Sequence, residues 1–471
     1  MKLRRSLAPL VSFAGLSLAA GWLGACSSAR APLAPFREPS AAAGGASAGA
    51  AKAPTFIEND FPKALAEAKR RGVPVVVDAW APWCHTCLSL RANVLHGEAL
   101  GAYADRFVWA SVDTERDESA AFLEKYPVAV WPTLWFLRPD GEPVARWLGA
   151  LTADELGTLL GEVEAAAKGG GGGGEAAAAL VRGDQRAAAG AGGEALAAYE
   201  EARKKAPAGW PMRGRLIDAY TSTLRAAGRA DECLAVASDE LRQLPPGTAR
   251  ANVVATALLC GEGLARGDAT DAKLEAVARE AEAIAGDRGQ RLLDDDRSTL
   301  YEAVVSFRKA RGDAAGARRV ATLWAAFLEG AASAAQTAEQ RAVFDAHRLL
   351  ARDALGQVEQ ILPTLEASER EAPGDYARSA RLALGYHLAR REVEASAAVE
   401  RALAKAYGPR KLRILSLKAD VLEARGDREG ARAALEEAVR YGETLKLSGG
   451  YAKLRDDLRK RVAAGPAAST K

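Results

Sequence analysis

The chain has 471 residues, more than one compact domain usually holds, so two or three domains are expected. Its apolar content of 49% is enough to form buried cores and excludes global disorder. Lys and Arg number 64 against 61 Asp and Glu, and the two signs alternate along the chain. No basic patch and no nucleic-acid partner are therefore expected. The four histidines are too few and too scattered for a dedicated metal protein, so no metal or other cofactor is expected.

Residues 1–26 have the pattern of an export signal. Basic residues at positions 2, 4 and 5 precede an apolar stretch over 7–23, and the segment ends in Leu-Gly-Ala-Cys at Cys26. This ending resembles the lipobox of bacterial lipoproteins, which implies a lipid anchor on Cys26 at the periplasmic side of the cell envelope. By the same resemblance, the outer membrane is favoured because no Asp follows the cysteine. The alternatives are an ordinary signal peptide or a short membrane anchor, although a spanning helix needs about 20 apolar residues.

Residues 27–54 are rich in Ala, Pro, Ser and Gly without periodicity, which indicates a disordered tether. The first folded domain is expected over 55–167. Its first helix is predicted over 61–71, with Asp60 as the N-cap and Gly72 after its end. The following stretch 73–78 is apolar almost throughout and predicts a strand that is buried on both faces.

A pair of cysteines separated by two residues, Cys84 and Cys87, opens the next predicted helix. Such a pair can close a disulfide, and the helix N-terminus stabilises the thiolate of the first cysteine. Haem attachment would need a histidine where Leu88 stands. Zinc binding would need a second ligand pair, and Cys233 and Cys260 do not have that spacing. The motif therefore predicts a redox-active pair.

The segment DAWAPWCHTC at 78–87, the Val-Trp-Pro-Thr at 130–133 and the Pro-Asp-Gly turn at 139–141 resemble the thioredoxin superfamily. Among relatives, the similarity is greatest to the periplasmic C-terminal domain of DsbD-type thiol-reductant transporters and to small exported thioredoxin-like proteins. The remaining elements predicted are strands over 107–113, 133–137 and 144–147 and helices over 118–126 and 153–167, the last capped by Thr152. Their order predicts an α/β thioredoxin fold.

The resemblance implies the catalytic roles. Cys84, with an exposed thiol, would be the nucleophile, and Cys87 would resolve the mixed disulfide. Asp78 would be the buried acid with a raised pKa that accepts the proton of Cys87; a capping or solvent-facing Asp is the alternative. A lysine often stands on the neighbouring strand in the family. Here Trp109 takes that place, which predicts that Asp78 has one cationic partner fewer.

Four residues are expected to bind an extended substrate: Trp83, Trp131, Pro132 and Thr133. By the resemblance, the Trp131–Pro132 peptide would be cis and would expose the Trp131 backbone beside the cysteines. Trp80 would either line the site or pack in the core.

His85 and Thr86 stand between the cysteines and would tune the redox potential. A protonated His85 would favour the Cys84 thiolate and make the couple more oxidising; the alternative is a solvated surface residue.

Lys168 and six glycines form a predicted linker over 168–174, and 464–471 are expected to be a disordered tail. Between them, 175–463 reads as successive helices broken at Gly190, Gly228, Gly267, Gly312 and Gly426. The unit over 411–440 resembles a tetratricopeptide repeat, which implies an all-α helical-repeat solenoid with a protein-binding surface. A generic alanine-rich helical array is the alternative.

The cysteines and histidines of the repeat region carry no predicted chemistry. Cys233 and Cys260 are either a structural disulfide or buried apolar residues. His347 and His387 are read as isolated residues with a structural or exposed position.

These features together predict a membrane-anchored, periplasmic thiol:disulfide oxidoreductase. Its partners would be protein thiol or disulfide substrates and an electron donor or acceptor protein, and its repeats would bind clients. One alternative is a non-enzymatic scaffold lipoprotein. Another is a copper- or haem-maturation factor that reduces a dedicated apoprotein.

Overall fold

The computed structural model describes residues 53–167, 174–447 and 449–464. The predictions for the export signal, for lipidation of Cys26, for nearly all of the tether, for the linker over 168–173 and for the tail from 465 lie outside the described residues. Gly174 and Ala464, which were predicted to belong to the linker and the tail, are helical. The described residues all belong to one compact unit.

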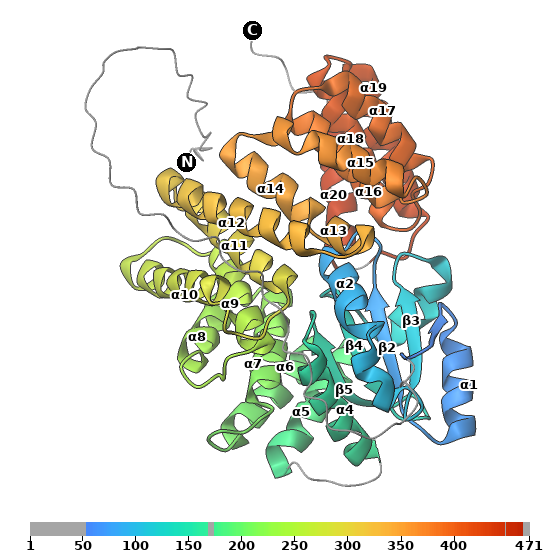
Figure 1. Cartoon of the computed structure of the whole chain (residues 1–471), viewed down its shortest axis with the longest axis vertical. Coiled ribbons are helices and arrows are strands. Elements are labelled where there is room, and N and C mark those ends of the chain that lie inside the picture. Colours follow the sequence, from blue (N-terminus) through green and yellow to red (C-terminus); the bar gives the residue numbers. More distant parts are fainter. Residues whose placement is uncertain (1–52, 168–173, 448, 465–471) are drawn as a thin grey trace. The chain divides into compact units, whose positions relative to one another are not determined.

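A five-stranded sheet forms the first part of this unit (Figure 1). The strand order is β1-β3-β2-β4-β5, with β1, β3 and β2 parallel and with β4 and β5 antiparallel to their neighbours. The strands are β1 Phe56–Glu58, β2 Val75–Trp80, β3 Val108–Asp113, β4 Thr133–Leu137 and β5 Pro143–Leu148. The helices that accompany them are α1 Phe61–Arg71, α2 His85–Leu90, α3 Ala120–Lys125 and α4 Ala153–Ala167. The predicted thioredoxin fold is confirmed.

Alternation along the central strand β2 decides what each face of the sheet contacts, because successive side chains of a strand point to opposite faces. Val75, Val77 and Ala79 share a buried cluster with residues of α1 and α3. Val76 shares the opposite cluster with residues of α2 and α4. Asp78 lies two residues after Val76 and therefore faces α2, on the side of the cysteine pair.

Several predicted boundaries differ from the structure. β2 starts at Val75 rather than 73 and continues to Trp80. The helix predicted over 118–126 is a short 3-10 turn followed by α3. The sequence prediction missed β1 because it has three residues and pairs with β3, about 50 positions away, so it has no periodicity of its own. It also missed the π-helical turn Arg91–Leu95 and the 3-10 helix Glu98–Tyr103.

Local signals gave the right result where they were strong. α1 begins after Asp60, whose Oδ1 accepts from the Lys63 N–H at 3.0 Å, and it ends at Gly72 with φ 67°. Both ends of α4 are as predicted, and the Glu155 N–H donates to Thr152 Oγ1 at 3.3 Å. These are the caps that supply partners for unpaired backbone groups at helix ends.

The second part of the unit is helical throughout, with successive helices packed in pairs such as α5 with α6 and α18 with α19 (Figure 1). The first eight helices are α5 Gly174–Ala188, α6 Gly192–Lys205, α7 Arg213–Ala226, α8 Ala230–Glu240, α9 Thr248–Gly261, α10 Asp268–Gly286, α11 Asp294–Ala310 and α12 Ala314–Ala334. They are followed by α13 Ala338–Val343, α14 Asp345–Leu355, α15 Leu362–Glu371, α16 Tyr376–Leu388, α17 Glu392–Leu403, α18 Arg410–Ala424, α19 Arg428–Glu443 and α20 Gly449–Ala464. The predicted helical-repeat organisation is confirmed.

The turn at Gly426 shows how these pairs are made. Gly426 has φ 81°, a left-handed conformation that only glycine adopts without strain, and it ends α18. Asp427 then caps α19 by accepting the Gly430 N–H at 2.8 Å. Gly190, Gly228 and Gly312 also have positive φ angles, whereas Gly267 is extended with φ −178°.

The sheet and the helices share buried polar contacts. Asp184 on α5 is fully buried and accepts hydrogen bonds from Arg215 Nη1 at 2.6 Å, from the Tyr199 hydroxyl at 3.0 Å and from the Arg146 backbone N–H of β5 at 3.3 Å. Arg215 also donates to the Arg146 carbonyl. A buried carboxylate with these donors is satisfied, so the network fixes β5 against α5 and α7.

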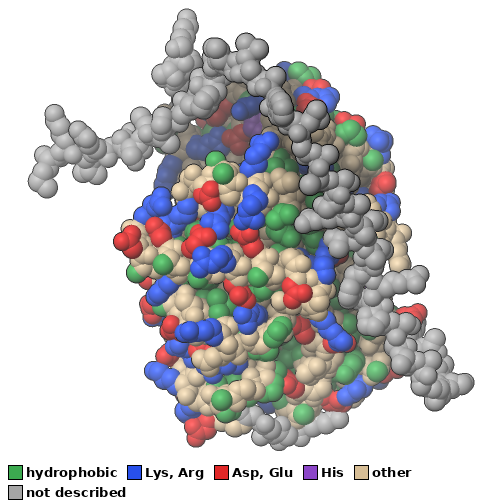
Figure 2. All heavy atoms as spheres, turned by 60° about the vertical axis from the view of Figure 1, so that its left-hand side comes forward, with side chains coloured by type: hydrophobic (Ala, Val, Ile, Leu, Met, Phe, Trp, Pro, Cys, Tyr) green, Lys and Arg blue, Asp and Glu red, His purple; other side chains and the backbone are tan. Residues whose placement is uncertain are grey.

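A second disulfide and a mixed surface complete the helical part. Cys233 on α8 and Cys260 on α9 are both buried and are bonded, with an S–S distance of 2.11 Å. Figure 2 shows Lys and Arg interspersed with Asp and Glu on the face that it draws. None of the described helices combines the length and the apolar content that crossing a bilayer requires.

Candidate active site

The two cysteines of the motif are bonded at the start of α2. Cys84 is the N-cap residue, and its Sγ accepts the Cys87 N–H at 3.0 Å. The Cys84–Cys87 disulfide has an S–S distance of 2.12 Å. The expected exposure of Cys84 is wrong, because this residue is only 5% exposed and Cys87 is fully buried.

Asp78 lies beneath the pair, in β2, and is 1% exposed. Burial raises its pKa to about 7, although the nearby guanidinium of Arg91 favours the charged form. Arg91 Nη1 lies 3.3 Å from Asp78 Oδ2, whereas Oδ1 has no hydrogen-bond partner. The predicted burial of Asp78 is confirmed, and the alternative of a solvent-facing Asp is wrong.

The prediction that Asp78 has one cationic partner fewer is wrong, because it assumed a different pairing of β2 with β3. Ser111, not Trp109, stands opposite Asp78 on β3, while Trp109 stands opposite Val76. Arg91 supplies the positive charge from the turn after α2, and the same nitrogen donates to Ser111 Oγ at 2.7 Å. A signal for Arg91 was present, since it follows Cys87 by four residues, on the same face of a helix.

Tryptophans surround the disulfide. Trp80, Trp83 and Trp131 pack against the cluster that both cysteines form with Ala81. The ring centroids of Trp83 and Trp131 are 5.4 Å apart. The guanidinium of Arg91 lies 4.2 Å from the centroid of Trp80. Trp80 therefore both lines the site and belongs to the core.

The Trp131–Pro132 peptide is cis, as expected from the resemblance. Pro132 and Thr133 are buried at the start of β4, and the Pro132 carbonyl accepts the Gly149 N–H at 2.8 Å. The Thr133 hydroxyl donates to the Val130 carbonyl at 2.7 Å. The hydroxyl of Thr133 thus stabilises the turn over residues 130–133.

Glu115 and Arg410 contact Trp83, the residue next to Cys84. Trp83 Nε1 donates to Glu115 Oε1 at 2.8 Å, and the Arg410 guanidinium lies 4.6 Å from the centroid of Trp83. The Arg410 backbone N–H and the Tyr451 hydroxyl also donate to Glu115. The helical part of the chain therefore covers Trp83, a residue that was predicted to contact substrate.

His85 is held by a residue of α11. Its Nδ1 lies 3.0 Å from both carboxylate oxygens of the buried Asp295 and 3.2 Å from Thr86 Oγ1. Burial lowers the pKa of His85, but the Asp295 carboxylate outweighs burial and the net shift of this pKa is upward. The alternative of a solvated surface residue holds only in part, because 26% of the His85 side chain is exposed but its Nδ1 is paired with a buried carboxylate.

His347 is not isolated, contrary to prediction. It is fully buried on α14, its ring centroid is 4.0 Å from that of His85, and its Nε2 lies 3.1 Å from Glu302 Oε2. His387, by contrast, pairs with Glu392, five residues away. No motif links Asp295, Glu302 or His347 to His85, and more than 200 residues separate them from it, so their proximity was not predictable from the sequence.

Comparisons with known proteins agree with this geometry. A family model described as a thioredoxin-like domain matches residues 61–164. Thioredoxin Y1 of Arabidopsis thaliana is 39% identical over 83 residues, which are 18% of this chain and 45% of the relative. The thiol:disulfide interchange protein DsbD of Vibrio vulnificus is 32% identical over 93 residues, 19% of this chain and 16% of the relative. The chain thus spans less than half of each of these two proteins.

Two further proteins are similar to this chain, one in structure and one in sequence. A tetratricopeptide repeat protein structure from Parabacteroides merdae is similar with a TM-score of 0.40 and 11% identity, covering 61% of this chain and 99% of that chain. Thioredoxin 1 of Synechococcus elongatus is 32% identical over 94 residues, which are 20% of this chain and 83% of the relative. Because that relative is matched over most of its length, the chain belongs to the thioredoxin family.

Proposed function

We propose that this chain is a thiol:disulfide oxidoreductase that exchanges disulfides with other proteins through Cys84 and Cys87. The observation that carries the proposal is the Cys84–Cys87 disulfide at the tip of α2, above the buried Asp78. The name of the Vibrio relative, a thiol:disulfide interchange protein, supports the same chemistry.

Each step of the exchange is assigned to a particular residue. In the reduced form, the Cys84 thiolate attacks a substrate disulfide, a mixed disulfide forms and one substrate thiolate leaves. Cys87 loses its proton to Asp78 and its sulfur then attacks Cys84 Sγ, which releases the second substrate thiolate. The protein ends oxidised, with the disulfide described here, and the substrate ends reduced. The reverse sequence oxidises a substrate dithiol.

Asp78 is suited to this proton transfer because its pKa is raised to about 7 by burial. A carboxylic acid with an ordinary pKa near 4 would be too weak a base for a thiol, whose pKa is about 8.5. The guanidinium of Arg91 stabilises the charged form of Asp78, so that Asp78 can still ionise.

Location and partners follow from the sequence and extend the proposal. A lipid on Cys26 would hold the chain at the periplasmic side of the bacterial envelope, at the outer membrane rather than the inner one. An electron donor or acceptor protein would reset the couple. Clients would contact the helical repeats and reach Cys84 when the contacts of Arg410 and Tyr451 with Glu115 open.

Insulin reduction with dithiothreitol as electron donor tests the proposal. The wild type is expected to accelerate insulin precipitation, and Cys84→Ser is expected to abolish the acceleration. The matched control is the double variant Cys233→Ala/Cys260→Ala, which removes the other buried disulfide and is expected to retain activity. A folded wild type that does not accelerate precipitation would contradict an exchange activity on proteins.

A scaffold role is the second candidate, because Cys84 is only 5% exposed. In that case the thioredoxin-like part would only bind peptides. Trapping with Cys87→Ser separates the candidates, since an exchanging enzyme accumulates mixed disulfides on Cys84. A single trapped apoprotein would instead indicate a dedicated copper- or haem-maturation factor, and no trapped protein would support the scaffold.

A further inference from the structure

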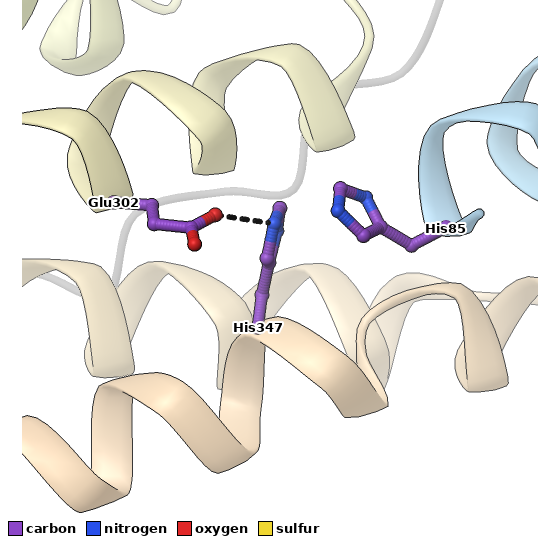
Figure 3. A group of neighbouring side chains, drawn as sticks. All are labelled: His85, Glu302 and His347. Atoms are coloured by element: carbon purple, nitrogen blue, oxygen red, sulfur yellow. Dashed lines mark ion pairs between the residues drawn. The ribbon is translucent and has the colours of Figure 1, made fainter. Parts of the chain in front are cut away.

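Three side chains from distant parts of the chain converge beside the redox helix (Figure 3). His85 comes from α2, Glu302 from α11 and His347 from α14. One nitrogen of each histidine and one carboxylate oxygen of Glu302 all lie within 4.8 Å of one another. This donor set differs from the cysteine pair and has no part in the exchange steps above.

The orientation of His85 leaves one nitrogen available. Its Nδ1 faces both oxygens of the Asp295 carboxylate at 3.0 Å and therefore carries the hydrogen. Nε2 is then the nitrogen left to bind a cation, which would displace a proton from it when the ring is charged. A carboxylate behind a histidine is the arrangement that orients metal-binding imidazoles in proteins. Asp295 is a positioning residue in this scheme.

His347 has unused bonding capacity. The residue is completely buried, and neither of its ring nitrogens makes a hydrogen bond. Nε2 forms an ion pair with Glu302 Oε2 at 3.1 Å, and Nδ1 lies 3.8 Å from Asp295 Oδ1, neither with hydrogen-bond geometry. Buried polar atoms nearly always have a hydrogen-bond partner, so two ring nitrogens without one leave capacity for a further ligand at this histidine.

Glu302 completes the set and offers access. Its side chain is 37% exposed, so an ion can reach the cluster from solvent. Carboxylate oxygens are common ligand atoms for divalent metal ions in proteins.

We infer that His85, Glu302 and His347 form a site for a divalent zinc-type metal ion. Two imidazoles and a carboxylate are a donor set that Zn²⁺ uses, with metal–ligand bonds of about 2.0–2.2 Å. Tetrahedral bonds of that length place ligand atoms about 3.3 Å apart. The 3.1 Å between His347 and Glu302 already meets this, and the full set needs only a small inward movement.

The site would join α2 of the thioredoxin-like part to α11 and α14 of the helical part. Its first ligand stands between the two cysteines. A bound ion would thus add a link between the redox helix and the helices that pack beside it, where contacts of α2 with α11 and α13 already exist. His85 and His347 are far apart in the sequence but adjacent in the structure, with ring centroids 4.0 Å apart.

Zinc binding to the oxidised chain tests the inference. The protein carries Cys26→Ser and no affinity tag, and a thiol assay verifies that no free thiol is present, since thiolates would themselves bind zinc. Isothermal titration with Zn²⁺ is expected to give one ion per chain. Co²⁺ is expected to give the visible absorption bands of a low-symmetry, four-coordinate site. Keeping the disulfide closed makes the result independent of exchange activity.

Ligand variants then locate the ion. Glu302→Gln, His85→Ala and His347→Ala are each expected to weaken Zn²⁺ binding by at least about tenfold. The matched control is His387→Ala, which removes a histidine that also faces a glutamate but lies outside the cluster, and it is expected to leave affinity unchanged. Circular dichroism verifies folding. If His347→Ala does not fold, the partly exposed Glu302→Gln decides.

Two results would overturn the inference. One is an oxidised wild-type chain that binds no Zn²⁺ in the micromolar range. The other is a folded Glu302→Gln variant that binds Zn²⁺ as tightly as the wild type, which would place any bound ion elsewhere.

Discussion

Replacing Asp78 by Asn should reveal the free-energy cost of a buried carboxylate under the disulfide. Asp78 is 1% exposed, and burial raises its pKa to about 7 from an ordinary value of 3.8. In the unfolded chain this group ionises near pH 4, whereas in the folded chain it ionises near pH 7. Folding therefore becomes less favourable as the pH rises between these values, because only the unfolded chain gains from ionisation.

The expected size follows from this difference. Each pH unit between the two pKa values corresponds to about 1.4 kcal/mol, so the full effect is about 4 kcal/mol. The stabilisation from the protonated acid is complete below about pH 4 and is lost as the pH rises to about 7. Asn has a similar shape and does not ionise. Asp78→Asn should therefore gain stability relative to the wild type over this range, by about 3 kcal/mol between pH 5 and 8.

Urea unfolding of both oxidised proteins at pH 5, 6, 7 and 8 measures this. All other titrating groups are shared, so the difference in unfolding free energy isolates Asp78. A difference that stays constant within about 0.5 kcal/mol from pH 5 to pH 8 would refute the reasoning. It would mean that Arg91, 3.3 Å away, compensates burial completely.

Three further outcomes are expected. Replacing Cys233 and Cys260 by Ala opens a loop with a separation of 27 residues and should lower the free energy of unfolding by about 3.5 kcal/mol, measured in urea; no loss would contradict this. Arg215→Leu leaves Asp184 buried without its closest cation and should cost about 3–5 kcal/mol, whereas the exposed pair control Arg182→Leu should cost less than about 1 kcal/mol. Gly408→Ala places a methyl group against the Glu115 backbone at φ 63°, so it should loosen the cover over Trp83 and speed alkylation of reduced Cys84; an unchanged rate in a folded variant would argue against that cover.

The functional residues that could be predicted from the sequence are those that lie close together along the chain. The cysteine pair, Asp78 and the cis Pro132 lie in short motifs, and caps such as Asp60 and Gly72 mark helix ends directly. What it missed depends on long-range contacts. The register of β3 against β2, which places Ser111 beside Asp78, is decided by packing over the whole sheet.

The same reason explains why the residues beside His85 were not predicted. Asp295 and His347 lie on helices of an array whose members contact mainly their neighbours, and nothing in their flanking residues differs from ordinary helix sequence. Their proximity to His85 comes from how the array folds back onto α2. A single sequence carries no pattern for such a contact.

If the chain exchanges disulfides as proposed, the bonds around Glu115 would make the helical array a filter for substrate size. A small disulfide would need only local fluctuation near Trp83 to reach Cys84, whereas a folded protein would have to displace Arg410 and Tyr451. Every 1.4 kcal/mol held in those contacts reduces the open population, and with it protein exchange, about tenfold. A client that binds the open form would remove this barrier for itself and leave it in place for its competitors.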